Sequence, residues 1–211
     1  NIIDRTTKET QLTRNTILEI YKRLKPEVKN KVLKNPEGFS EIFIREIRNQ
    51  LADHIADTIE YRLTEEKTKY DLQEVFPETK HFPQKELIDG TENSLYDVVQ
   101  IDSDVEFRFV KNRLQDDDTA GNILFYFKFP NAFKISMPKL IQNYCPDWGV
   151  VRKGSDGKTT IQLVRETKGT MLLDRLRFPN ESRKIACATK HFEELEIGYR
   201  SVDDKVLRWW E

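Results

Sequence analysis

The sequence is poor in the features that mark secreted, disulfide-rich and membrane proteins. Only two of its 211 residues are cysteines, which is too few for a disulfide scaffold, and neither lies in a Cys-x-x-Cys pair of the metal-binding type. No apolar run approaches the roughly 20 residues needed to span a bilayer, and residues 1–5 have neither an initiator methionine nor the character of a signal peptide. We therefore expect a fragment of a longer chain that resides in a reducing cytoplasm and has no membrane partner.

The sequence also lacks an overall charge that would by itself indicate a nucleic-acid partner. Its formal net charge is −1 at pH 7. The charge is unevenly distributed, because residues 1–127 hold 19 basic and 25 acidic side chains whereas residues 128–211 hold 16 basic and 11 acidic ones. A polyanion would therefore bind more readily to the second part of the chain.

Two helices are predicted in the first 64 residues. Thr13 can cap a helix that ends before Pro26, and Pro36 begins a second helix that should run to about residue 64. Apolar residues recur along the second helix at steps of four, which predicts a core or docking face: Phe39, Phe43, Ile47, Leu51, Ile55, Ile59 and Leu63. His54 on the same helix is interpreted as a structural residue.

The pattern changes between residues 65 and 95, where prolines and a glycine replace long periodicity and a strand-like piece lies near 70–76. We therefore expect a helical bridging region over residues 1–90 and a separate domain over residues 91–211. In that domain the sequence predicts an α/β fold of the order α-β-β-β-α-β. Its elements are expected as a helix near 103–114, strands near 122–128, 147–152 and 160–167, a helix near 181–194 and a strand near 195–200.

The candidate catalytic residues follow an apolar strand that ends in charge. Because strand side chains alternate, Glu166 and Lys168 should project from the same face, while Thr167 points away and leaves its carbonyl available. Asp147 lies just upstream, and a hairpin through the turn at residues 154–157 would place it beside Glu166. Two carboxylates and one lysine would then converge at one end of the sheet.

This set of groups suits phosphodiester hydrolysis. Carboxylates and a backbone carbonyl are hard oxygen ligands for Mg²⁺, which keeps several waters and binds phosphate oxygens, and Mn²⁺ can substitute. The expected ligands are Asp147, Glu166 and the Thr167 carbonyl, with Lys168 orienting the attacking water or stabilising charge on the phosphate. The triplet Glu-x-Lys alone is weak evidence, but only the Glu166 copy follows a strand-like run and a Pro-Asp dipeptide.

Pro146-Asp147 followed by Glu166-x-Lys168 resembles the signature of the PD-(D/E)xK nuclease superfamily. Longer stretches resemble the C-terminal endonuclease domain in the restriction subunit of type III restriction enzymes. These stretches are residues 94–97, 102–106, 128–130, 133–135, 143–148, 165–170 and 184–192. One departure is Cys145, where the family commonly has asparagine before Pro-Asp.

The resemblance implies a restriction-endonuclease-like core, with a mixed sheet flanked by helices, that cleaves double-stranded DNA in a prokaryotic cytoplasm. It also implies an ATP-dependent helicase-like motor in the same polypeptide and a separate methyltransferase subunit that reads the DNA site. ATP should not bind this fragment, because Gly157-Lys158-Thr159 lacks the upstream glycine of a phosphate-binding loop and is better interpreted as a hairpin turn.

Three further side chains have two interpretations each. The resemblance makes Glu106 an auxiliary metal ligand, but Ser103-x-x-Glu106 is also the pattern of a helix capping box. Lys184 and His191 lie two helical turns apart and could both contact a DNA backbone, or could be ordinary surface residues.

Two alternative functions remain open for the whole domain. It could be a DNA-docking or subunit-coupling module with a nuclease fold, although the intact set of Asp147, Glu166 and Lys168 argues against a degenerate site. It could also be a repair or junction nuclease of the same superfamily, which the longer stretches of resemblance disfavour. Among the tryptophans, Trp148 is expected in the core, and the pair Trp209 and Trp210 on a part of the protein outside this sequence.

Overall fold

The computed structural model describes residues 1–65, 71–78, 86–169 and 179–211. They form two compact units, Asn1–Thr58 and Ile59–Glu211. Within the described residues, no helix combines the length and the apolar character that a membrane crossing requires. The expected boundary at residue 90 between a bridging region and an endonuclease domain stays a prediction.

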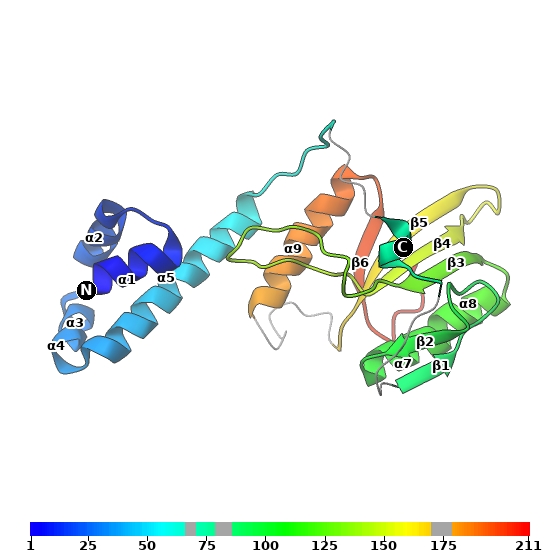
Figure 1. Cartoon of the computed structure of the whole chain (residues 1–211), viewed down its shortest axis with the longest axis horizontal. Helices are drawn as coiled ribbons and strands as arrows, with labels where there is room; N and C mark the ends of the chain where they lie inside the picture. The colour runs from blue at the N-terminus through cyan, green and yellow to red at the C-terminus, as the bar shows by residue number, and fades with distance from the viewer. Residues whose placement is uncertain (66–70, 79–85, 170–178) are drawn as a thin grey trace. The chain divides into compact units, whose positions relative to one another are not determined.

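The first unit is entirely helical. Its helices are α1 (Ile2–Thr10), α2 (Arg14–Arg23), α3 (Pro26–Lys29), α4 (Lys31–Lys34) and α5 (Pro36–Thr58) (Figure 1). Thr13 caps α2 as predicted, because its side chain accepts a hydrogen bond from the Thr16 amide. The core forms where Phe39, Phe43 and Ile47 of α5 pack on Ile3 and Ile17, so the first half of the predicted apolar stripe is a core face.

The prediction that the second long helix runs to residue 64 is wrong. Helix α5 ends at Thr58, and the residues that follow contact α9 (Pro179–Glu194). The Lys190 ammonium donates to the Ile59 carbonyl at 3.3 Å, and the Tyr61 ring packs edge-on against His191. Tertiary contacts of this kind compete with the helical hydrogen bonds that periodicity alone would continue.

The second unit contains helices and two sheets. In chain order its elements are α6 (Leu72–Val75), β1 (Glu86–Asp89), β2 (Val98–Ile101), α7 (Asp104–Phe109), the π-helix η1 (Val110–Leu114), α8 (Gln115–Thr119), β3 (Ile123–Lys128), β4 (Trp148–Lys153), β5 (Thr160–Thr167), α9 and β6 (Gly198–Val202). From α7 onward the order is the predicted helix, three strands, helix and strand, with the first helix continuing through η1 and α8.

Three local predictions for this unit are corrected by the structure. The described part of the strand-like piece near 70–76 is the short helix α6, and the β1–β2 ribbon was not predicted. The last strand begins at Gly198 rather than near 195, because the chain first closes the end of α9. There Glu196 has a left-handed φ of 55°, and the Ile197 amide donates to the Phe192 carbonyl at 2.9 Å.

The main sheet is mixed and has the strand order β3-β4-β5-β6 (Figure 1). β4 pairs antiparallel with both β3 and β5, and β6 runs parallel to β5. The β4–β5 hairpin turns through residues 154–157 as predicted, and Gly157 adopts a positive φ of 65° that favours glycine at this position. In this register Trp148 lies opposite Arg165, so Asp147 and Glu166 fall at the same end of the hairpin.

The core of the second unit lies between the main sheet and the α7–η1 segment. Trp148 is fully buried in it, as predicted. The expectation that Trp209 and Trp210 pack on a part of the protein outside this sequence is wrong for Trp209. This residue is 1% exposed, and its ring packs edge-on against Phe109 with 5.7 Å between the ring centroids. Its carbonyl accepts a hydrogen bond from the buried Arg165 guanidinium at 2.6 Å, so the end of the chain is part of this domain.

Candidate active site

Asp147 is held against the end of β5. It directly precedes β4, and its Oδ2 accepts hydrogen bonds from the Thr167 amide at 2.7 Å and from the Thr167 hydroxyl at 2.6 Å. The expectation that the Thr167 side chain points away is therefore wrong, because this buried threonine fixes the orientation of Asp147. The metal-binding role assigned to the Thr167 carbonyl stays a prediction.

Glu166 lies next to Asp147 and is 5% exposed. Its Oε1 pairs with the Lys168 ammonium at 2.9 Å, and its Oε2 accepts a hydrogen bond from the Tyr144 hydroxyl at 2.5 Å. Lys168 also lies 3.5 Å from Oε1 of Glu181 in the first turn of α9. The structure thus brings Asp147, Glu166 and Lys168 together as the sequence predicts.

Burial disfavours the ionised forms of the two carboxylates. Burial, followed by the charge of Glu166, raises the pKa of Asp147 to about 7 despite the hydrogen bonds from Thr167. Burial also raises the pKa of Glu166, against the opposing effects of Lys168 and Tyr144. Burial lowers the pKa of Lys168, but the acidic groups around it, chiefly Glu166, more than offset that effect and leave the pKa raised. The lysine therefore stays protonated beside the carboxylates.

Glu106 combines features of both of its interpretations. The Ser103 hydroxyl caps α7 by accepting a hydrogen bond from the Glu106 amide at 3.2 Å, and Oε2 of Glu106 accepts from the Asp102 amide at 3.0 Å. The same oxygen pairs with Lys128. The charge of Asp147 contributes to the raised pKa of Glu106, whose largest cause is burial, so Glu106 lies within electrostatic reach of Asp147.

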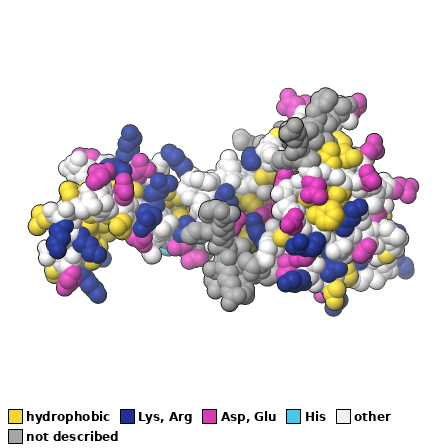
Figure 2. Space-filling view, turned by 90° about the horizontal axis from the view of Figure 1, so that it is seen from below, with side chains coloured by type: hydrophobic (Ala, Val, Ile, Leu, Met, Phe, Trp, Pro, Cys, Tyr) yellow, Lys and Arg dark blue, Asp and Glu magenta, His cyan; other side chains and the backbone are white. Residues whose placement is uncertain are grey.

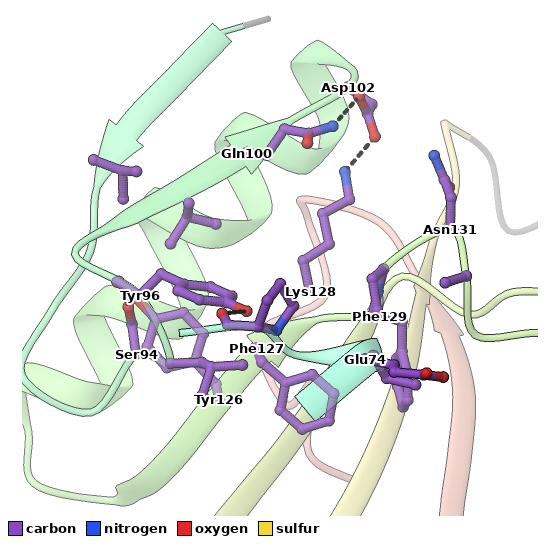
Figure 3. A pocket seen from close by; sticks show the side chains of 17 residues that line it. Glu74, Ser94, Tyr96, Gln100, Asp102, Tyr126, Phe127, Lys128, Phe129 and Asn131 are labelled. Carbon is purple, nitrogen blue, oxygen red and sulfur yellow. Dashed lines mark hydrogen bonds and ion pairs between the residues drawn. The ribbon is translucent and has the colours of Figure 1, made fainter. Parts of the chain in front are cut away.

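Lys128 pairs with Glu106 and also lines a neighbouring cavity. Figure 3 shows its side chain extending from the end of β3 to Asp102, with 2.6 Å between Nζ and Oδ2. The cavity has a volume of about 410 Å³, and Phe127 and Phe129 are among the residues that line it. Asp102 and Lys128 also line the cavity, whereas the described lining does not include Asp147, Glu166 or Lys168.

The family model described as an endonuclease domain, RE_endonuc, matches residues 92–205. The chain belongs to this endonuclease family. The match covers more than half of the sequence and includes Asp147, Glu166, Lys168 and Glu106, so it supports nuclease activity for the domain that contains the site. Comparisons with curated proteins and with solved structures find no match.

Sequence reasoning missed four side chains around the site of this endonuclease domain: Lys128, Tyr144, Glu181 and Tyr199. Lys128 could have been found from the hairpin register, because it ends β3 directly opposite Trp148. Tyr144 reaches Glu166 from a long loop, Tyr199 reaches Tyr144 from β6, and Glu181 reaches Lys168 from α9. No sequence spacing indicates those three contacts, because each depends on how separate segments pack.

The predicted DNA contacts on α9 lie in different surroundings. His191 is half-buried between aromatic rings, 5.1 Å from Tyr61 and 5.2 Å from Phe192, and burial lowers its pKa. Lys184 is half-buried. On the face shown in Figure 2, basic and acidic side chains are interspersed rather than separated. A role for Lys184 and His191 in binding DNA stays a prediction.

The donor atoms of the endonuclease site fit a divalent cation held by two carboxylates. Among the described residues there is no group of three or more His, Cys, Asp or Glu side chains that could hold a metal ion. Asp147 and Glu166 nevertheless provide adjacent hard oxygen ligands of the kind that Mg²⁺ prefers. Burial raises the pKa of both carboxylates, and a bound cation would favour their ionised forms. Water and phosphate oxygens would supply the remaining ligands.

Proposed function

We propose that residues 91–211 hydrolyse phosphodiester bonds of double-stranded DNA with Mg²⁺, as the PD-(D/E)xK nuclease domain of a type III restriction enzyme. The observation that carries this proposal is the meeting of Asp147, Glu166 and Lys168 at one end of the β4–β5 hairpin. Membership of the endonuclease family supports the reaction class. The sequence resemblance supports the type III setting.

Each residue of the site has a role that follows from its contacts. Asp147 and Glu166 would hold the metal, and Thr167 orients Asp147 through two hydrogen bonds. The bound metal would lower the pKa of a water and polarise the phosphoryl group. Lys168 is fixed between Glu166 and Glu181, where its ammonium can donate to a phosphate oxygen or to the attacking water.

The proposed enzyme needs more than this domain. The resemblance assigns an ATP-dependent motor to the same polypeptide and recognition of the DNA site to a methyltransferase subunit. The nuclease domain would then supply cleavage without choosing the sequence. In the proposed mechanism the side chains of the site would contact phosphate and metal rather than bases, which agrees with this division.

Metal binding tests the site directly. Calorimetric titration with Mn²⁺ or Mg²⁺ should show binding to the native chain, and both Asp147→Asn and Glu166→Gln should weaken it sharply, because each removes a charged ligand. The exposed carboxylates Asp97 and Glu193 provide matched controls, and Asp97→Asn and Glu193→Gln should leave the affinity unchanged. Equal affinity in all four variants would overturn the proposal and favour a DNA-docking module.

Cleavage by the assembled enzyme is the second test. When the domain is supplied with its motor, the methyltransferase subunit and ATP, Lys168→Met should abolish DNA cleavage while the chain still binds metal. The lysine contacts the carboxylate and would act on water or phosphate rather than on the metal. Native cleavage rates in the Lys168→Met enzyme would contradict this role.

A pair of substitutions separates the two roles of Glu106. Ser103→Ala removes the cap of α7 and should cost about 1 kcal/mol of unfolding free energy without changing metal affinity. Glu106→Gln keeps an oxygen that can accept from the Asp102 amide but removes the charge, so it should lower the cleavage rate at least about 10-fold. If Glu106→Gln changes stability as Ser103→Ala does and leaves cleavage intact, Glu106 only caps the helix.

A further inference from the structure

Tyr144 is carried to the catalytic carboxylates by the loop between β3 and β4. Ile135 and Tyr144 exchange two backbone hydrogen bonds, at 2.7 and 3.1 Å, across an antiparallel bridge within this loop. The bridge fixes the backbone of Tyr144, and its side chain is buried, with 5% exposed. A buried hydroxyl requires a hydrogen-bond partner, and this one finds Glu166.

The hydrogen bonds around this hydroxyl have a defined direction. The Tyr144 hydroxyl lies 2.5 Å from Oε2 of Glu166 and 2.9 Å from the Tyr199 hydroxyl. An ionised carboxylate can only accept and each hydroxyl has one proton, so Tyr144 donates to Glu166 and accepts from Tyr199. Burial, followed by the charge of Glu166, raises the pKa of both tyrosines, which therefore keep their protons.

Both oxygens of Glu166 are thereby fixed by different partners. Oε2 accepts from Tyr144, and Oε1 pairs with Lys168 at 2.9 Å. Rotation of the carboxylate would break a charge-assisted hydrogen bond, which is stronger than a neutral one. Tyr199 lies in β6 beside β5, and its ring stacks on Phe192 of α9 with 5.2 Å between the centroids. This packing fixes the position of the Tyr199 hydroxyl that donates to Tyr144.

We propose that Tyr144 is a positioning residue that holds Glu166 in the orientation needed to bind metal, with Tyr199 fixing the Tyr144 hydroxyl. The inference rests on the proposed function, since it requires Glu166 to be a metal ligand. Hydrogen-bond partners that orient metal ligands change metal affinity by about 10- to 100-fold when they are removed. The loop between β3 and β4 thereby becomes part of the catalytic machinery.

Substitution of single hydroxyl groups tests this proposal. Tyr144→Phe keeps the ring and removes the donor, so the Mn²⁺ dissociation constant measured by calorimetry should rise about 10- to 100-fold. Tyr199→Phe should give a smaller change in the same direction. Tyr126→Phe is the matched control, because Tyr126 is fully buried and its hydroxyl is bonded to Thr91 instead; its affinity should equal that of the native chain.

A metal-free measurement separates failure of this inference from failure of the proposed function. In EDTA, the ¹³C resonance of the Glu166 carboxyl, assigned by its loss in Glu166→Gln, should shift in Tyr144→Phe and not in Tyr126→Phe. No shift, or a shift with unchanged Mn²⁺ affinity, overturns the positioning role alone. If the native chain binds no Mn²⁺, the proposed function and the inference both fail, whether or not the resonance shifts.

Discussion

Replacement of Asp147 by asparagine should make the metal-free protein more stable at pH 8 while removing the proposed metal-dependent activity. The pKa of Asp147 is raised from 3.8 to about 7 by burial and by the charge of Glu166, so the folded protein binds this proton more tightly than the unfolded chain. The stabilisation that this proton binding contributes is fully present below about pH 4 and is lost as the pH rises through 7. At pH 8 the aspartate is ionised, and the stability of the folded protein is reduced by the full cost of burying this charge.

The expected gain for Asp147→Asn at pH 8 is about 1–3 kcal/mol. A shift of about three pKa units corresponds to about 4 kcal/mol. Solvent at this partly exposed group reduces that value, and a neutral amide oxygen accepts weaker hydrogen bonds from Thr167 than a carboxylate does. The residual gain reflects removal of a carboxylate charge whose burial is unfavourable.

Urea unfolding in EDTA at pH 8 and at pH 5 measures this effect. The variant should be more stable than the native chain at pH 8, and the difference should shrink at pH 5, where the native aspartate is protonated. Saturating Mg²⁺ should reverse the order, because only the native chain gains binding energy. Asp97→Asn, at an exposed position, should change none of these values. A variant that is less stable than the native chain at pH 8 without metal would contradict the argument.

Replacement of Trp209 by alanine should destabilise the second unit by about 3–5 kcal/mol. The indole is 1% exposed and packs edge-on against Phe109, so its loss leaves a cavity in the core. The backbone carbonyl at the same position accepts from the buried Arg165 guanidinium, and a cavity beside that contact would loosen it. Because Arg165 directly precedes Glu166, the end of β5 that holds the candidate site should lose order together with the core.

Trp210→Ala is the matched control for this prediction. The Trp210 ring is half-buried and lies 4.1 Å from the Arg152 guanidinium, and a cation–π contact of this kind contributes about 1 kcal/mol. Urea unfolding followed by tryptophan fluorescence reports on the second unit, since all three tryptophans lie in it. Similar decreases in the free energy of unfolding in the two variants would contradict the large cost expected for Trp209→Ala.

The end of the hairpin that holds the candidate site could be predicted because an apolar strand run and turn chemistry are local signals. The apolar run before Glu166, the glycine turn at residues 154–157 and the Pro-Asp dipeptide together indicate the register that places Asp147 beside Glu166. Predictions from local sequence patterns were wrong where tertiary contacts override the local preference of the chain. Helix α5 stops at Thr58 and its next residues contact α9, and α6 forms where a strand-like piece was expected.

The sequence by itself determined the order of elements from α7 to β6, the burial of Trp148 and the residues that meet at the end of β4 and β5. These features depend on neighbours along the chain or across one hairpin, which residue spacing specifies. Only the tertiary structure decided that Thr167 turns its hydroxyl onto Asp147, that Tyr144 and Tyr199 support Glu166, and that Trp209 returns to the core. The physical reason is that each of these contacts satisfies a buried polar group or fills core volume between segments that no local pattern connects.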